Sequence, residues 1–271
     1  RRAMTFISVT RGDGPLVLSM PHGGRTIPPE FAGRMTDVAR GVPDTDWWIE
    51  RLYDFGTGLN ASVVRTDISR YVIDVNRDPS GKSLYPGQAN TALCPLETFE
   101  GEPLYRTGAE PDANEIAARR QAYFEPYHKM LREVLDRARA KHGYALLYDC
   151  HSIRSVIPRL FAGRLPVFNI GVNGGRSCAP PLARAVSAAC GADPDYDFVV
   201  DGRFKGGWIT RHYGNPEGGV HALQMELAQR AYMMETPPWT YDEAKAERLQ
   251  KVLRRALAAY LAAAAQMNEA A

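Results

Sequence analysis

Cysteines are few in this 271-residue chain, and no two of them lie close together in the sequence. They stand at Cys94, Cys150, Cys178 and Cys190 and form no CxxC pair. This spacing argues against a disulfide framework and against a thiolate zinc site, and it fits a reducing compartment. The first residues, RRAMTFISV, also lack the apolar stretch of a secretory signal peptide. We therefore expect a cytoplasmic protein.

The chain also lacks an excess of charge of one sign and any long hydrophobic run. Lys and Arg number 33 and Asp and Glu number 31, so the formal net charge is only +2. Proteins that bind nucleic acids or membrane surfaces usually carry a larger basic excess. No apolar run approaches the ~18 residues that a transmembrane helix needs. We expect neither a nucleic acid nor a membrane among its partners.

The overall composition is that of an ordinary globular protein. Hydrophobic residues make up 45% of the chain and charged residues 24%, which argues against disorder. A chain of this length can bury a large core without disulfides. We expect a single domain over residues 1–271, with a long loop at about 78–111 that is rich in Gly, Pro and Thr.

Apolar patterning predicts strands that alternate with helices. The predicted strands are 16–20, 61–64, 71–75, 144–148 and 221–227. The predicted helices are 46–55, 112–141, 180–190 and 241–268, and Pro126 should kink or split the second of these. This order is typical of an α/β layered sandwich with a largely parallel sheet. We expect the Ala-rich last helix to pack against the rest of the domain. The alternative is that it supports a homodimer.

Polar residues follow several of the predicted strands or lie near their ends. They are Pro21-His22-Gly23-Gly24, Asp74-Val75-Asn76-Arg77, Asp149-Cys150-His151-Ser152 and Glu226. In open α/β sheets, ligands bind beyond the carboxyl ends of the strands, so these clusters predict one convergent site. Neutral imidazoles are common metal ligands, which makes His22 and His151 candidate ligands, and Asp149 could orient the second ring. The alternatives are a loop or capping role for His22 and a salt-bridged Glu226.

The other four histidines are weaker candidates. His128 lies inside the long predicted helix and His142 at its end, and we expect both to be solvated. His212 and His221 flank a glycine-rich stretch. We expect structural hydrogen bonds for these two, with a place in the lining of the site as the alternative.

Six stretches of the chain resemble the N-formylglutamate amidohydrolase family. They are SMPHGGRTIPPEF, DTDWWIERLYDF, SRYVIDVNRDPSG, ALLYDCHSIRS, DGRFKGGWITRHYG and HALQMELAQRAYM, within about residues 16–234. That family is in turn similar to zinc carboxypeptidases and aspartoacylase. The resemblance implies a three-layer sandwich with a mixed central sheet, a Zn²⁺ held by two histidines and a carboxylate, and a catalytic glutamate. It also implies hydrolysis of N-formyl-L-glutamate to formate and L-glutamate in histidine degradation.

The resemblance assigns most of the site directly. It places the metal on His22 and His151, the catalytic glutamate on Glu226, and a substrate carboxylate on Asn76 and Arg77. The relatives carry their acidic ligand three residues after the first histidine, where this chain has Arg25. We predict Asp46 as the carboxylate ligand in its place, with Asp44 and Glu50 as the alternatives.

The implied substrate is a small molecule with two carboxylates, and arginine pairs well with carboxylates. After Arg77, the candidate cations in decreasing order are Arg70, Arg154, Lys205 and Arg211. A zinc-activated water with Glu226 as general base is the expected mechanism. Co²⁺, Ni²⁺ or Fe²⁺ would suit the same ligands. The alternatives are a zinc hydrolase of another N-acyl amino acid and a non-catalytic binder of acidic metabolites.

Overall fold

One mixed sheet forms the centre of the molecule. The computed structural model describes residues 6–82 and 92–271, and in these residues seven strands are arranged in the order β1-β3-β2-β4-β7-β5-β6. Their bounds are β1 Ile7–Thr10, β2 Leu16–Met20, β3 Ser62–Thr66, β4 Ala145–Ile153, β5 Phe168–Gly171, β6 Phe198–Val200 and β7 Val220–Ala228. The central strands β3, β2, β4 and β7 are parallel, whereas β1 and β5 are antiparallel to the neighbours that they pair with, β3 and β7.

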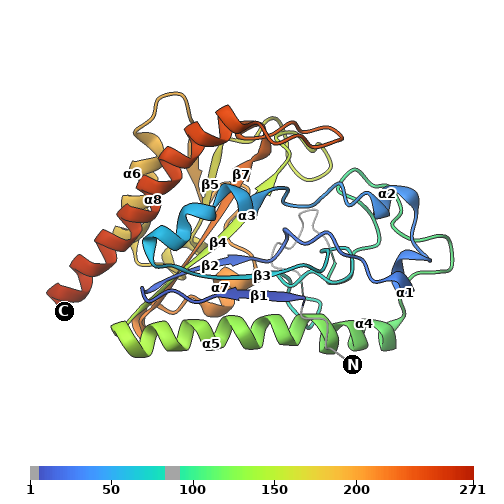
Figure 1. Cartoon of the computed structure of the whole chain (residues 1–271), viewed down its shortest axis with the longest axis horizontal. Helices are drawn as coiled ribbons and strands as arrows, with labels where there is room; N and C mark the ends of the chain where they lie inside the picture. The colour runs from blue at the N-terminus through green and yellow to red at the C-terminus, as the bar shows by residue number, and fades with distance from the viewer. Residues whose placement is uncertain (1–5, 83–91) are drawn as a thin grey trace.

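Helices cover both faces of this sheet (Figure 1). On one face lie α3 (Ile49–Leu52), α6 (Pro180–Gly191) and α8 (Glu243–Ala270), and on the other lie α5 (Glu125–His142) and α7 (Trp208–Tyr213). Successive side chains of a strand point to opposite faces. Leu16 and Leu18 accordingly pack in the core beneath the first group, and Val17 packs in the core beneath the second. The predicted three-layer α/β sandwich is confirmed.

The two strands that carry the chemistry are long and fully buried. Both β4 and β7 have nine residues, and all of them are buried. The predicted strand 144–148 therefore continues to Ile153, so that Asp149 and His151 lie within it and do not follow it. Polar residues can occupy these positions because they are hydrogen-bonded there. In the parallel pairing of β4 and β7, His151 is the neighbour of Glu226.

The segment 71–75 was predicted as a strand, and that prediction is wrong. Tyr71 to Val75 are buried, but they form turns and loop. Their backbone groups find partners outside any strand ladder: Asp74 N–H donates to the carbonyl of Leu93, and Arg119 donates to the carbonyl of Val72. The apolar run reflects burial among helices and loops, which sequence alternation alone cannot distinguish from a strand.

Two predicted helices are interrupted. In place of the helix 46–55, α3 covers only Ile49–Leu52, and the 3₁₀ helix η1 (Asp54–Leu59) follows it. The helix predicted over 112–141 consists of α4 (Ala113–Arg119), one wide π-helical turn η2 (Arg120–Phe124) and α5. The second interruption confirms the expected effect of Pro126, which lies in the first turn of α5.

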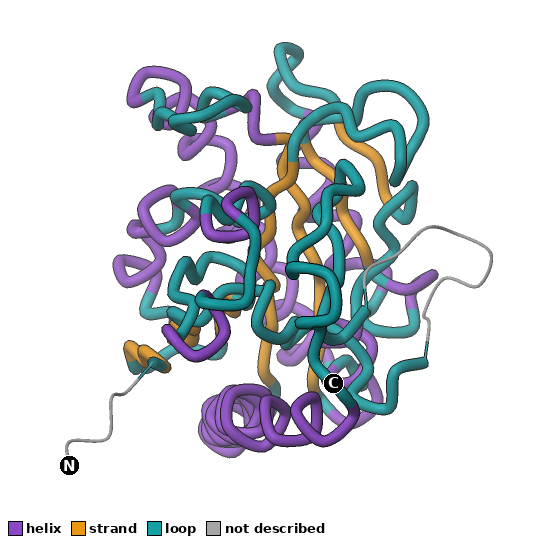
Figure 2. The backbone as a smooth tube through the Cα atoms, turned by 90° about the vertical axis from the view of Figure 1, so that its right-hand side faces the viewer, coloured by secondary structure: helices purple, strands orange, loops and turns teal. Residues whose placement is uncertain are grey.

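Loops and short helices occupy the end of the sheet at which the central strands finish, the side that faces the viewer in Figure 2. The short elements on this side are α1 (Pro29–Ala32), α2 (Asp37–Arg40) and η5 (Gln229–Ala231). By contrast, η3 (Asn173–Gly175) follows the antiparallel strand β5, and η4 (Pro216–Gly218) precedes β7. Of the predicted loop 78–111, residues 78–82 and 92–111 contain no helix or strand, and residues 83–91 lie outside the described part. Within residues 6–82 and 92–271, no helix combines the length and the apolarity that crossing a bilayer requires.

Candidate metal centre and active site

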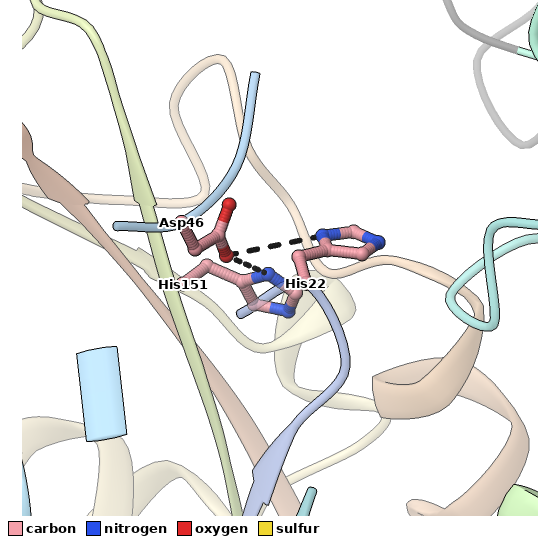
Figure 3. Close-up of side chains that lie close together, drawn as sticks. All are labelled: His22, Asp46 and His151. Atoms are coloured by element: carbon pink, nitrogen blue, oxygen red, sulfur yellow. Dashed lines mark hydrogen bonds and ion pairs between the residues drawn. The ribbon is translucent and has the colours of Figure 1, made fainter. Parts of the chain in front are cut away.

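Two histidines and one aspartate from distant parts of the chain meet beyond the sheet. His22 follows β2, Asp46 precedes α3, and His151 lies in β4. All three are buried, and one ligand atom from each lies within 4.8 Å of the others. Asp46 Oδ2 is 3.9 Å from His22 Nδ1 and 3.1 Å from His151 Nδ1 (Figure 3). Two imidazoles and a carboxylate make a common donor set for catalytic zinc.

Backbone contacts explain why these residues converge. β2 and β4 are adjacent and parallel, so His22 and His151 reach the same edge of the sheet. Asp46 N–H donates to the carbonyl of His22 at 3.0 Å, which fixes the Asp46 loop beside the first histidine. Gly24 allows the chain to pass close to the segment after β3, because a Cβ at this position would lie 2.5 Å from the carbonyl carbon of Asp67.

A second carboxylate holds the far nitrogen of each imidazole. His22 Nε2 lies 2.5 Å from Asp74 Oδ1, and His151 Nε2 lies 2.6 Å from Asp149 Oδ2. Histidines that bind metals usually donate their other N–H to a carboxylate or carbonyl, which fixes the ring and its tautomer. Both rings are therefore held with Nδ1 toward Asp46. This arrangement fits a divalent ion among His22, Asp46 and His151.

The charges at the site support the same conclusion. Burial and the nearby Arg70 lower the pKa of His22, so its ring is neutral and Nδ1 keeps a lone pair. Burial alone would raise the pKa of Asp74, but Arg77, His22 and Arg70 outweigh it and hold that pKa well below the usual range. Burial opposes protonation of His151 too, yet Asp149 and Asp46 raise its pKa well above 6.5. Carboxylates that attract a proton to this place would also attract a metal cation.

Glu226 is the ionisable group beside this centre. It lies in β7, next to His151 in the β4–β7 pairing, and is buried. Burial raises its pKa to about 8, and the Asp46 carboxylate adds to this effect against His151 and Arg70. A carboxyl group with a pKa near neutral is suited to both accepting and donating a proton.

The geometry favours Asp46 over the two alternative carboxylates. Asp44 is already engaged elsewhere: its Oδ2 accepts from the Tyr71 hydroxyl at 2.5 Å and its Oδ1 from Arg154 at 3.0 Å. Glu50 lies on α3 and is partly exposed. Asp44 does not cap α3 either, because the residue that precedes this helix is Trp48, in a left-handed conformation with φ of 62°.

Arg25 occupies the position where the relatives have their acidic ligand. Its guanidinium lies over the rings of Trp47 and Trp48, at 5.6 and 5.5 Å from their centres. These are cation–π contacts with the two residues that follow Asp46. Arg25 therefore packs against the segment that carries Asp46.

Three of the predicted substrate-binding residues border the centre. Arg70 is buried between two carboxylates, with distances of 3.6 Å to Asp46 Oδ1 and 3.3 Å to Asp74 Oδ2. Arg77 lies 3.6 Å from Asp74 Oδ2 and is partly exposed. Asn76 Nδ2 is 3.4 Å from His151 Nε2, and its Oδ1 accepts from the N–H of Ile209 at 2.8 Å. Arg70 and Asn76 thus have structural partners as well as a place at the site.

The other three predicted cations, Arg154, Lys205 and Arg211, have hydrogen bonds to other parts of the structure. Arg154 donates to Asp44 and to the carbonyl of Pro43. Lys205 is exposed, and its carbonyl accepts from the N–H of Asn173. Arg211 Nε donates to the carbonyl of Gly206 at 2.8 Å. The Lys205–Gly207 loop still reaches the site, because Gly207 approaches so closely that a Cβ there would lie 2.5 Å from Asn76 Nδ2.

Asp74 and His128 are the two residues that sequence reasoning misjudged. The sequence alone assigns no role to Asp74, although its position beside Asn76 and Arg77 is a signal of one. His128 was expected to be solvated, which is wrong: its Nδ1 lies 2.7 Å from the Tyr213 hydroxyl and its Nε2 lies 2.7 Å from the carbonyl of Val75. Its helix packs against the loop 71–77 at this point.

The remaining histidines are consistent with structural roles. His221 accepts from the N–H of Ala179 at 3.1 Å, as the sequence suggested. His212 is exposed and stacks on Trp208 with 4.1 Å between ring centres. His142, at the end of α5, lies with Nε2 2.7 Å from the carbonyl of Asp13.

The burial of His128 predicts a loss of stability in acid. Burial, aided by Arg132 and His212, lowers its pKa from 6.5 to about 4. Between these values the unfolded chain binds a proton that the folded chain does not, so the free energy of unfolding falls as pH falls from 6.5 to 4. The full shift corresponds to about 3 kcal/mol. Urea unfolding of wild type and His128→Gln at pH 7 and 4.5 should show a smaller loss in the variant; equal losses would contradict the prediction.

Comparison with known proteins adds independent findings. A family model described as N-formylglutamate amidohydrolase matches residues 14–233. The chain is 49% identical over 256 residues to N-formylglutamate deformylase of Pseudomonas putida and 48% identical to that of Pseudomonas aeruginosa, covering 94% of this chain and 96% of each relative. A crystal structure of N-formylglutamate amidohydrolase from Ralstonia eutropha superposes with a TM-score of 0.79 at 21% identity, over 98% of this chain and 99% of the other, and shows the same fold.

Proposed function

The chain belongs to the N-formylglutamate amidohydrolase family, and we propose that it hydrolyses N-formyl-L-glutamate to formate and L-glutamate. The observation that carries the proposal is the convergence of His22, Asp46 and His151 within 4.8 Å of one another, with Glu226 on the neighbouring strand. The names and near-complete coverage of the two Pseudomonas relatives support the substrate. We further propose a cytoplasmic role in histidine degradation, with neither a nucleic acid nor a membrane as partner.

We propose that His22, Asp46 and His151 hold a zinc ion, with another divalent transition metal as the alternative. When bound, zinc supplies a Lewis acid and makes water nucleophilic near neutral pH. Asp74 and Asp149 keep the two rings in the tautomer that presents Nδ1. Arg70 contacts the second oxygen of Asp46 and so limits that carboxylate to one free oxygen.

Glu226 performs the proton transfers in the proposed reaction. It takes a proton from the water that attacks the formyl carbon and delivers it to the nitrogen of the departing amine. Its burial keeps the transfer out of bulk solvent, and its pKa of about 8 lies close to neutral pH. One water is consumed, the C–N bond breaks, and formate and L-glutamate leave without a covalent intermediate on the protein.

Arg77 is the proposed receptor for a substrate carboxylate, with Asn76 beside it. Arg77→Ala should raise KM for N-formylglutamate far more than KM for N-formylglutamine if Arg77 binds the side-chain carboxylate. If it binds the α-carboxylate, KM should rise equally for both substrates. Steady-state kinetics of both substrates separate the two cases. Arg184→Ala, an exposed position on α6, is the control; unchanged KM values in the Arg77 variant would exclude it from substrate binding.

The direct test of the proposed function measures formate and metal together. Zinc-loaded protein is incubated with N-formylglutamate, N-acetylglutamate and N-formylnorvaline, and released acid and free amine are quantified. From N-formylglutamate we expect one formate per glutamate. Release from the other two compounds should be slower than from N-formylglutamate. Faster release from N-acetylglutamate would indicate a different amidohydrolase. Binding of N-formylglutamate without turnover, in a protein for which metal analysis shows that no zinc was taken up, would indicate a non-catalytic binder.

A further inference from the structure

We propose that Arg119 and His128, which flank the π-helical turn η2, are positioning residues of the active site. Both act through the loop 72–77, which carries Asp74, Asn76 and Arg77. The inference rests on the proposed function, because that function gives the site its role. The contacts on which it is argued involve only the candidate metal centre and the loop beside it. Neither residue is among the candidate ligands or substrate-binding groups.

Arg119 holds the start of this loop. Its side chain is 1% exposed, and Nη1 donates to the carbonyl of Val72 at 2.9 Å and to the Tyr105 hydroxyl at 2.7 Å. Nη2 pairs with Glu115 at 2.8 Å, and the guanidinium lies over the Phe31 ring. A planar fork engaged on several sides has little freedom to move. The carbonyl of Val72 is thus fixed to the helix below the sheet.

His128 holds the middle of the loop, and its contacts define its tautomer. Nε2 lies 2.7 Å from the carbonyl oxygen of Val75, which can only accept, so Nε2 carries the hydrogen. Nδ1 is then an acceptor and receives the hydrogen bond of the Tyr213 hydroxyl at 2.7 Å. The Trp208 and Phe124 rings pack against the imidazole. The neutral ring is therefore a rigid link between α7 and the loop.

Two residues between and beside these anchors, Asp74 and Asn76, contribute to the site. Asp74 lies between the anchored carbonyls of Val72 and Val75 and holds Nε2 of the ligand His22 at 2.5 Å. Asn76 follows Val75 directly, and its own N–H donates to Asp74 Oδ1 at 2.8 Å. Because the loop is not part of the sheet, no strand ladder fixes these atoms. Arg119 and His128 supply that constraint together with the N–H of Asp74, which donates to the carbonyl of Leu93.

The π-helical turn explains how one helix supplies both anchors. Arg119 and His128 are nine positions apart, which in a continuous α-helix is about 2.5 turns and would place them on opposite sides. The wider turn of η2 accommodates one extra residue. The effective separation then becomes about 2.2 turns, so both side chains face the same loop. Such turns are frequent at functional sites.

The test measures zinc affinity, which does not depend on the substrate. Zinc-loaded full-length protein is titrated with a chelating dye for wild type, His128→Phe and His128→Gln. Phenylalanine fills the same space without hydrogen bonds, whereas glutamine can still donate to the carbonyl of Val75. We expect the zinc dissociation constant to rise about 10-fold or more in His128→Phe, as for other groups that orient metal ligands, and to stay within about threefold in His128→Gln.

His142→Phe is the matched control, because His142 lies on the same helix and its ring also meets a backbone carbonyl, that of Asp13, far from the loop. It should leave zinc affinity unchanged. Folded His128→Phe with wild-type zinc affinity, or equal losses in the Phe and Gln variants, would overturn the proposal. If His128→Phe does not fold, zinc affinity is measured for Arg119→Lys, because one ammonium cannot replace the guanidinium that contacts Val72, Tyr105 and Glu115. Unchanged zinc affinity of Arg119→Lys would also overturn the proposal. Absence of formate release in wild type would count against the proposed function only.

Discussion

Glu226→Gln is expected to reduce kcat for N-formylglutamate by about 10²–10⁴-fold while the protein keeps its full metal content. Glutamine has nearly the same shape, so packing between β4 and β7 should be preserved. It cannot accept the proton of the attacking water, and that is the function proposed for Glu226. Metal analysis and formate release on the same preparation would measure both effects.

The control for this variant is Glu217→Gln, an exposed carboxylate in η4 just before β7. It should leave both kcat and metal content unchanged. The pH profile gives a further check. The part of the pH dependence of kcat that comes from ionisation of Glu226 should be absent from the residual activity of the variant. Substantial activity of Glu226→Gln would remove Glu226 from the acid–base role and return it to a structural carboxylate.

Most of the candidate site could be predicted from the sequence because its main residues follow or lie in apolar strands. His22 lies just after β2, His151 lies in β4 and Glu226 lies in β7. The parallel arrangement of these strands brings the three residues to one edge of the sheet. The layered fold followed from the same alternation of strands and helices. Strand length was harder, because β4 continues through Asp149 and His151, polar residues whose hydrogen bonds are invisible in the sequence.

The parts that could not be predicted depend on contacts between distant segments. The sequence predicts Asp46 but leaves Asp44 and Glu50 as alternatives, because the contacts of Asp44 with Tyr71 and Arg154 join distant segments. The short strands β1, β5 and β6 gave no clear periodic signal. The loop 71–77 is apolar enough to resemble a strand.

The burial of His128 follows from the same kind of distant contact. Its ring is held by the carbonyl of Val75 and by Tyr213, both far from it in the sequence. Neither contact is encoded within α5, where a histidine among charged residues has the pattern of a solvated position. Local patterning therefore identified the polar strand ends but not the helix side chains that support them.

His22→Ala and His151→Ala are each expected to strip zinc from the protein, and Asp46→Asn should weaken its binding strongly. Each substitution removes one of three protein ligands, and the alanine variants also leave Asp74 or Asp149 as a buried carboxylate without its imidazole partner. Repulsion within the emptied centre should then further disfavour the ligand geometry. Metal content after dialysis, measured together with circular dichroism, would separate metal loss from unfolding.

Asp44→Asn provides the matched comparison for Asp46→Asn. Both carboxylates are buried and only two positions apart, but Asp44 contacts Tyr71, Arg154 and the N–H of Phe99. Asp44→Asn should therefore lower the free energy of unfolding, since a hydrogen bond to a charged group contributes about 1.5–3 kcal/mol, while the folded protein retains zinc. Asp46→Asn should instead lose zinc, with a smaller change in the free energy of unfolding. Zinc loss in the Asp44 variant, with normal content in the Asp46 variant, would transfer the ligand assignment to Asp44, and normal content in either histidine variant would exclude that histidine as a ligand.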